Sequence, residues 1–244
     1  MDGTRRRYRE SMQPEGFVSF TGKYKESDLH FAVEAGDFMP DLAEFAESRI
    51  IFYRTQLEEY LQLDPFFRLT LEPHLVRADA PPIALVMARA ANTAGVGPMA
   101  AVAGAFAELV GKDLLCRVKQ VIVENGGDIF LQVAKPVQVS VLAGDSPLQV
   151  ALELPVRTAP YGVCTSSGTV GPSLSLGKAD AAVIISSSAP LADAVATAAG
   201  NRVQTASDLP AALAFARNIR GVEGVLLIKD DKMAAWGNIK LVPA

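Results

Sequence analysis

Apolar segments of strand length occur in neighbouring pairs along this chain, and this pairing is the feature that most limits its fold. The turns within pairs are short and polar or rich in glycine, which antiparallel hairpins allow and parallel crossovers do not. The predicted strands cover residues 17–20, 28–33, 118–123, 129–133, 137–142, 150–154, 179–185, 222–228 and 236–242. The sequence therefore favours antiparallel sheets over a doubly wound parallel sheet.

Segments with apolar residues at helical spacing separate the strand pairs. The predicted helices cover residues 37–63, 83–110 with a break at 95–98, 191–201 and 209–219. Between the first two helices, residues 64–82 carry four prolines, which predicts an irregular crossing segment. The order strand, strand, helix, helix, strand, strand thus occurs twice, with extra strand material around Cys164.

This recurrence predicts an α+β fold of two similar units, each an antiparallel sheet backed by a helix pair, with buried helices between them. Of the 244 residues, 50% are hydrophobic, so the chain can bury a sizeable core. We expect a single domain built of two intimately packed halves, approximately 1–135 and 136–244. The apolar helices and paired strands also favour burial in a homo-oligomer.

The charge pattern argues against nucleic acid and membrane partners. The net charge is −4 with acids and bases interspersed, so no broad basic surface is expected. One basic cluster lies near the N-terminus, at Arg5, Arg6, Arg7 and Arg9. It is either a solvated tail or an arm over an anionic ligand. No apolar signal segment precedes it, so a cytoplasmic location is expected. Residues 94–110 are nearly uncharged but contain Pro98 and Glu108, which indicates a buried helix.

Two cysteines and two histidines limit the available chemistry. Cys116 and Cys164 are far apart and form no CxxC motif, so neither a zinc site nor a disulfide framework is predicted. Both are expected to be buried thiols, although Cys164 adjoins a hydroxyl-rich turn and could be reactive there. His30 and His74 offer little support for a serine or cysteine triad.

Two glycine-containing segments are candidate binding sites. In the segment AGVGPMAAVAG, Gly95 and Gly97 precede a predicted helix start, where free amides suit an anion, but small residues there also allow two helices to pack closely. The second segment is Asn125, Gly126, Gly127 and Asp128. It is either an ordinary hairpin turn or a place where a ligand approaches the backbone and a polar side chain reads it.

The stretch 161–201 carries the remaining candidates. Its hydroxyl-rich turn consists of Thr165, Ser166, Ser167 and Thr169. In the following helix, for which Ser188 is the expected cap, Asp193 and Thr197 fall on one face. A carboxylate and a hydroxyl so placed could hold Mg²⁺, with phosphate and water completing its shell. The alternative is an acid favourably placed near a helix N-terminus and a threonine bonded to its own backbone.

Three motifs in this order, VIVENGGDIFL, GVCTSSGTVG and ADAVATAAGN, resemble the ApbE superfamily of FAD:protein FMN transferases. The chain is most similar to the cytoplasmic, functionally uncharacterised branch of that superfamily. The resemblance implies a duplicated fold of the T-fold type. It also implies that Asp193 and Thr197 are side-chain ligands of Mg²⁺ and that the GGD and TSSG turns line a flavin nucleotide site.

In the transferases of this superfamily, Mg²⁺ bridges the pyrophosphate of FAD, and the FMN phosphoryl group moves to a hydroxyl of a target protein. They carry a histidine in an HxxDP-like segment after the TSG turn, whereas this chain has Pro172 in that region. Two functions stay open on this basis. One is an enzyme that binds FAD, FMN or another phosphorylated small molecule with Mg²⁺ and transfers a flavin or phosphoryl group. The other is a non-catalytic binding or structural protein with a degenerate site.

Overall fold

The computed structural model describes residues 15–169, 175–237 and 239–243. The arginine cluster at residues 5–9 and the departure at Pro172 lie outside these ranges. Both therefore stay predictions from the sequence.

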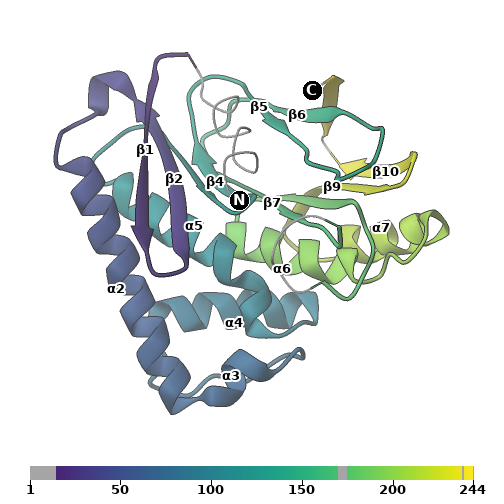
Figure 1. The fold of residues 1–244 in the computed structure, drawn as a ribbon, viewed down its shortest axis with the longest axis horizontal. Coiled ribbons are helices and arrows are strands. Elements are labelled where there is room, and N and C mark those ends of the chain that lie inside the picture. The colour runs from purple at the N-terminus through teal and green to yellow at the C-terminus, as the bar shows by residue number, and fades with distance from the viewer. Residues whose placement is uncertain (1–14, 170–174, 238, 244) are drawn as a thin grey trace.

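One antiparallel sheet of eight strands organises the molecule, in the order β1-β2-β3-β4-β7-β8-β9-β10 (Figure 1). Its strands are β1 (Phe17–Tyr24), β2 (Ser27–Glu34), β3 (Val121–Asn125), β4 (Asp128–Gln132), β7 (Tyr161–Ser166), β8 (Ala181–Ser186), β9 (Val222–Lys229) and β10 (Lys232–Gly237). Each neighbouring pair is antiparallel, as the short turns predict.

The helices occupy two long connections within this sheet. The first connection holds α2 (Leu42–Leu63), α3 (Pro65–Leu69), α4 (Pro82–Ala94), the 3₁₀ helix η2 (Pro98–Ala101) and α5 (Val102–Leu114). The second holds α6 (Ala189–Gly200), the 3₁₀ helix η3 (Ala206–Asp208) and α7 (Leu209–Arg217). A further 3₁₀ turn, η1 (Ala35–Asp37), follows β2. The proline-rich crossing is irregular as predicted, except for the short helix α3.

The duplication predicted from the sequence is present. Strands β1 and β2, a set of helices, and strands β3 and β4 form one unit, and β7, β8, helices, β9 and β10 repeat that order. The two units join edge to edge, because β4 pairs with β7 and places Ile129 opposite Val163. The expectation of helices between two sheets was wrong: the helices share one face of a single continuous sheet, since both units present that face to the same core.

The two strands predicted at 137–142 and 150–154, which were expected to open the second half, do not belong to the large sheet. β5 (Val137–Ser140) and β6 (Val150–Leu154) form a separate three-stranded sheet with β11 (Lys240–Pro243). The closing segment predicted as one strand at 236–242 is divided between β10 and β11, which lie in different sheets. Local apolar patterning predicts a strand but does not specify its partner. The true first pair of the second unit is β7 and β8.

The helices and the small sheet lie on opposite faces of the large sheet (Figure 1). Each forms an apolar layer with the face that it covers. The helices pack against residues such as Phe31, Phe130 and Cys164, whereas the small sheet packs against residues such as Ile129 and Val163. Because side chains alternate along a strand, each strand residue can be assigned to the helix face or to the small-sheet face. This assignment decides which predicted site residues can meet.

The apolar helices and the two cysteines can also be located in the structure. No single helix in the described ranges is long and apolar enough to cross a membrane; α4 and the stretch Pro98–Leu114 meet the criteria only as a pair, bent by 104°. Most of both helices is buried in the structure.

Cys164 is buried as expected, but Cys116 is exposed just after α5, so that prediction was wrong for Cys116.

Candidate functional site

Asp193 is a buried carboxylate at the junction of α5 and α6. It is 9% exposed, and the backbone amide of Gly104 donates to its Oδ2 at 2.9 Å. Burial raises the pKa of Asp193 to about 7, against the opposing effect of the Gly104 and Ala103 amides. Gly104 permits this contact, because a Cβ there would lie 2.4 Å from the carbonyl oxygen of Ala189 and 2.9 Å from the Cβ of Asp193.

Thr197 follows Asp193 by one turn of α6 and is half-buried. The two side chains therefore fall on one helix face, as expected from their spacing. This helix runs along β7: a Cβ on Gly162 would meet Ala189 at the start of α6, and a Cβ on Gly200 would lie 3.6 Å from the Ser166 hydroxyl near its end. Glycine and alanine bring the backbones of helix and strand close together.

The four hydroxyls of the hydroxyl-rich turn, Thr165, Ser166, Ser167 and Thr169, do not all face this junction. Strand alternation places Ser166 on the helix face with Cys164, and Thr165 on the opposite face with Val163. Burial and the neighbouring Asp128 raise the pKa of the Cys164 thiol, which donates to the carbonyl oxygen of Ala189 at 3.2 Å. Cys164 is thus a neutral structural thiol, since reactive cysteines need a stabilised thiolate.

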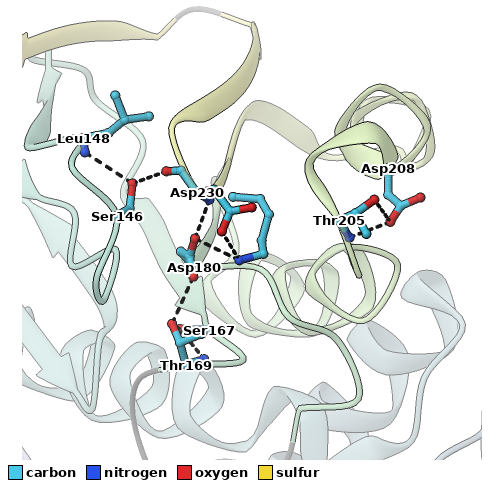
Figure 2. Close-up of polar contacts among 9 residues, drawn as sticks. Ser146, Leu148, Ser167, Thr169, Asp180, Thr205, Asp208 and Asp230 are labelled. Atoms are coloured by element: carbon cyan, nitrogen blue, oxygen red, sulfur yellow. Dashed lines mark hydrogen bonds and ion pairs between the residues drawn. The ribbon is translucent and has the colours of Figure 1, made fainter.

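The other two hydroxyls of the turn are tied to the sheet instead (Figure 2). Ser167 and Thr169 are within hydrogen-bond distance of each other, and Thr169 donates to Asp180 Oδ1 at 3.4 Å. The buried Asp180 in turn accepts from the Asp230 amide at 2.6 Å and pairs with Lys229 at 3.4 Å. These contacts give Ser167 and Thr169 a structural role that the sequence does not reveal.

The hairpin turn at residues 125–128 lies on the same side as Asp193. Gly126 and Gly127 both have positive φ, 68° and 108°, as the tight turn between β3 and β4 requires. Asn125 donates to the carbonyl oxygen of Ala103 at 3.1 Å, one residue before the amide that holds Asp193. A Cβ on Gly126 would have no atom within 4 Å, so the turn has open space around it. Both proposed readings of this segment, turn and ligand approach, are compatible with this geometry.

Asp128 is buried beside these groups. It is 8% exposed, and its Oδ1 has no hydrogen-bond partner in the described part of the chain. Burial raises the pKa of Asp128 well above its usual value, and the charge of Asp193 raises it further. Two acidic side chains from the two units of the fold therefore influence each other at this junction.

Gly97 shows the close packing that was the alternative to anion binding, whereas a Cβ on Gly95 would meet no atom within 4 Å. Gly95 ends α4 in the left-handed conformation, with φ of 73°. Gly97 is buried, and a Cβ there would lie 2.0 Å from the carbonyl oxygen of Thr70. Backbone from the segment after α3 thus covers Gly97, which leaves no space for an anion on that side.

The start of α6 is capped by a residue that sequence reasoning missed. Ser188 occupies the expected cap position, but its side chain makes no capping hydrogen bond. Glu108 of α5 accepts from the Ala189 amide at 2.7 Å and pairs with Lys112 at 2.5 Å. In the sequence this contact is marked only by one glutamate, Glu108, within an apolar helix. The Ala189 amide that it binds lies 81 positions further along the chain.

A cavity of about 280 Å³ opens beside the same helix start. Its lining comes from α4, α5 and the beginning of α6, and comprises Val86, Arg89, Ala90, Thr93, Glu108, Ser188, Pro190 and Leu191. None of the binding residues predicted from the sequence lines it. This cavity therefore offers no support for the predicted nucleotide site.

The donor set at the junction is suited to a hard cation rather than a transition metal. The described residues contain no group of three or more His, Cys, Asp or Glu side chains placed to hold a metal ion. Mg²⁺, however, commonly uses one or two carboxylates and takes its remaining oxygens from phosphate and water. The unpartnered oxygen of Asp128 beside Asp193 is compatible with such an ion.

Comparison with known proteins identifies the family. The family model described as "AbpE bacteria" matches residues 9–234. This chain belongs to that family. Among its relatives are a UPF0280 protein from Methanocella arvoryzae, 42% identical over 234 residues and covering 95% of this chain and 94% of the relative, and one from Methanosarcina acetivorans, 41% identical over 203 residues with 82% and 80% covered.

The fold of this ApbE-like protein also occurs in solved structures. The flavinyl transferase ApbE of Pseudomonas stutzeri, in its apo form, matches with a TM-score of 0.59 and 16% identity over 90% of this chain and 93% of that one. The flavin transferase ApbE of Vibrio cholerae matches with a TM-score of 0.51 and 14% identity, with 91% and 97% covered. At this identity the likeness establishes the duplicated α+β fold alone.

Proposed function

We propose that this ApbE-like protein binds a flavin nucleotide together with Mg²⁺ at the junction of α5, α6 and the turn at residues 125–128. The observation that carries the proposal is the buried Asp193, which the Gly104 amide fixes one turn before Thr197. A carboxylate desolvated to this degree is costly unless a proton or a cation accompanies it. The flavin transferases that share the fold supply the class of ligand.

In this proposal each element has a separate task. Asp193 and Thr197 would hold the cation, which would supply positive charge next to a bound pyrophosphate. Gly126 and Gly127 let the nucleotide approach the backbone, while Asn125 ties the turn to α5 through Ala103. Ser166 and the backbone around Thr165 line the nucleotide site on the side of β7. Asp193 is kept in position by packing of small residues rather than by a flexible loop.

Binding can be tested by isothermal titration of FAD, with and without Mg²⁺, into the full chain. Wild type should bind FAD more tightly with Mg²⁺, and Asp193→Asn should lose at least ~10-fold in Mg²⁺-dependent affinity. Asp145→Asn is a matched control, because it removes the same charge from an exposed loop. Equal binding by wild type and Asp193→Asn would contradict the proposal.

Transfer is a separate question from binding. In the superfamily reaction, the pyrophosphate of FAD is cleaved, AMP leaves, and the FMN phosphoryl group forms an ester with a protein hydroxyl. Pro172 in place of a histidine favours a second candidate, a protein that binds the nucleotide without transferring it. Incubation with FAD and Mg²⁺, followed by chromatography for AMP, decides between them: release of AMP that Asp193→Asn abolishes supports transfer, and stable bound FAD supports binding alone.

A further inference from the structure

Asp128 has an oxygen atom whose environment is incomplete. The residue is 8% exposed, and its Oδ1 has no hydrogen-bond partner among the described residues. A buried polar atom left without a partner costs roughly 1–3 kcal/mol, so native folds satisfy nearly all such atoms. The atom therefore points to a partner that binds after folding.

The strand register shows which way Asp128 faces. Phe130, two residues on, lies on the helix face of β4, where a Cβ on Gly111 of α5 would be 2.3 Å from its ring. Because side chains alternate along a strand, Asp128 lies on the same face. Continuing the pairing of β4 with β7 places Asp128 beside Cys164, whose thiol contacts Ala189 at the start of α6.

The same stretch of α5 connects Asp128 to Asp193. Asn125, opposite Asp128 across the hairpin, donates to the carbonyl oxygen of Ala103. The next residue, Gly104, donates its amide to Asp193. The two acidic side chains thus approach one junction from different units of the fold, one from β4 and one from α6.

The charges at this junction need compensation. Asp128 and Asp193 are both buried carboxyl groups, and contacts of Asn125 and Asp193 with Ala103 and Gly104 bring their elements to the same stretch of α5. Like charges in a dry site require either a shared proton or a cation between them. A divalent ion would balance the two carboxylates and supply the missing partner of Oδ1.

We propose that Asp128 is a further ligand of the cation, bound through Oδ1 together with Asp193 and Thr197. This inference rests on the proposed function and assigns Asp128 to the metal rather than to the flavin. Two carboxylates and one hydroxyl would hold the cation, and phosphate and water would supply its other oxygen ligands. The site then depends on both units of the duplicated fold.

The alternative is that Asp128 stays protonated and neutral when the cation binds. The substitution Asp128→Asn separates the two, because asparagine has the shape of a neutral carboxyl group but cannot supply a negative charge. Mn²⁺ serves as the probe, and its binding to the full chain is measured by electron paramagnetic resonance with FAD present. We expect Asp128→Asn to weaken Mn²⁺ binding at least ~10-fold.

Glu124→Gln is the matched control. Glu124 is also buried and lies at the end of β3, but strand alternation places it on the small-sheet face with Ile122. Glutamine retains an acceptor for the Gly127 amide, which Glu124 accepts at 2.8 Å. Glu124 acts on Asp128 through its charge but is not a proposed ligand, so the affinity of Glu124→Gln for Mn²⁺ should fall by no more than about threefold.

The results distinguish this inference from the proposed function. If wild type and Asp128→Asn bind Mn²⁺ equally while Asp193→Asn does not, Asp128 is not a ligand and the proposed function stands. If wild type binds no Mn²⁺, both fail. Thermal unfolding in EDTA establishes that each variant is folded, and Asp128→Ser serves if the asparagine variant is not; wild-type affinity in whichever variant folds overturns the inference.

Discussion

The first helix after each opening strand pair, α2 in one unit and α6 in the other, packs against the same sheet in different ways. α2 has 22 residues and buries one stripe of side chains that includes Ile50, Tyr53 and Tyr60. α6 has 12 residues and buries ten of them, mostly alanine. α2 meets the sheet through large side chains, whereas α6 meets it almost backbone to backbone.

Glycines beneath the two helices show the difference directly. A Cβ on Gly22 would lie 3.0 Å from the end of the Ile50 side chain, but a Cβ on Gly162 would lie 2.4 Å from the Cα of Ala189. Side-chain ends can rotate away, whereas backbone cannot. Of these two helices, α6, which carries Asp193, therefore has less freedom to move.

The largest effect is expected from substitutions at these two glycines. Gly162→Ala should lower the free energy of unfolding by about 3 kcal/mol or more, because helix α6 must shift away from β7. Gly22→Ala should cost about 1 kcal/mol, because Ile50 can change rotamer. Thermal and urea unfolding of both variants measure the contrast. Equal losses would show that α6 is no more constrained than α2.

The next effect concerns the pH dependence of the metal-free protein. The pKa of Asp193 is about 7 in the folded protein against an ordinary value of 3.8, so the unfolded chain releases this proton first as pH rises. Stability from this group is therefore complete below about pH 4 and is lost by about pH 7.

Asp193→Asn does not ionise and escapes this loss. In EDTA, its advantage in unfolding free energy over wild type should increase by on the order of 3 kcal/mol between pH 4 and pH 8. Urea unfolding at a series of pH values measures the difference. Parallel stability curves for the two proteins would show that burial of Asp193 costs nothing.

A smaller effect is expected at the start of α6. Glu108→Ala removes the acceptor for the Ala189 amide and should cost about 1–2 kcal/mol. Ser188→Ala should cost less than about 0.5 kcal/mol, because the serine side chain makes no capping bond. Thermal unfolding of the pair measures the contrast, and the reverse order would restore Ser188 as the cap.

The smallest effect is expected where α2 is joined to α5. The Tyr53 hydroxyl donates to Asp113 at 2.9 Å, and Arg49 pairs with the same carboxylate at 2.6 Å. Tyr53→Phe should cost about 1 kcal/mol, because Arg49 still satisfies Asp113. The Mg²⁺-dependent affinity for FAD should stay at the wild-type value, since α2 contributes no atom to the proposed site. A loss of that affinity would show that packing of α2 also positions Asp193.

Repetition and local pattern predicted much of this fold from the sequence. The antiparallel strand pairs, the broken helix around Gly95 and the shared face of Asp193 and Thr197 follow from spacing within short segments. These features depend on residues that are neighbours in the chain. The family resemblance of the motifs is confirmed by the match over residues 9–234.

What the sequence did not predict depends on distant partners. The strands at 137–142 and 150–154 look like any other hairpin until β11 pairs with them. Thr165 and Ser166 are adjacent in the sequence but face opposite layers. The missing partner of Asp128 Oδ1 becomes evident only once the neighbouring residues of β7 and α5 are in place. The cytoplasmic location, the boundary at residue 135 and the homo-oligomer stay predictions.

The pairing of β11 with β6 has a consequence for synthesis of the protein on the ribosome. The strands and helices of the first unit are all made before β7, so that part of the large sheet can begin to form during translation. The small sheet forms later, because its strand β11 (Lys240–Pro243) follows β10, the last strand of the large sheet, in chain order. The layer that covers the second face of the large sheet is therefore completed only after every strand of the large sheet has been made.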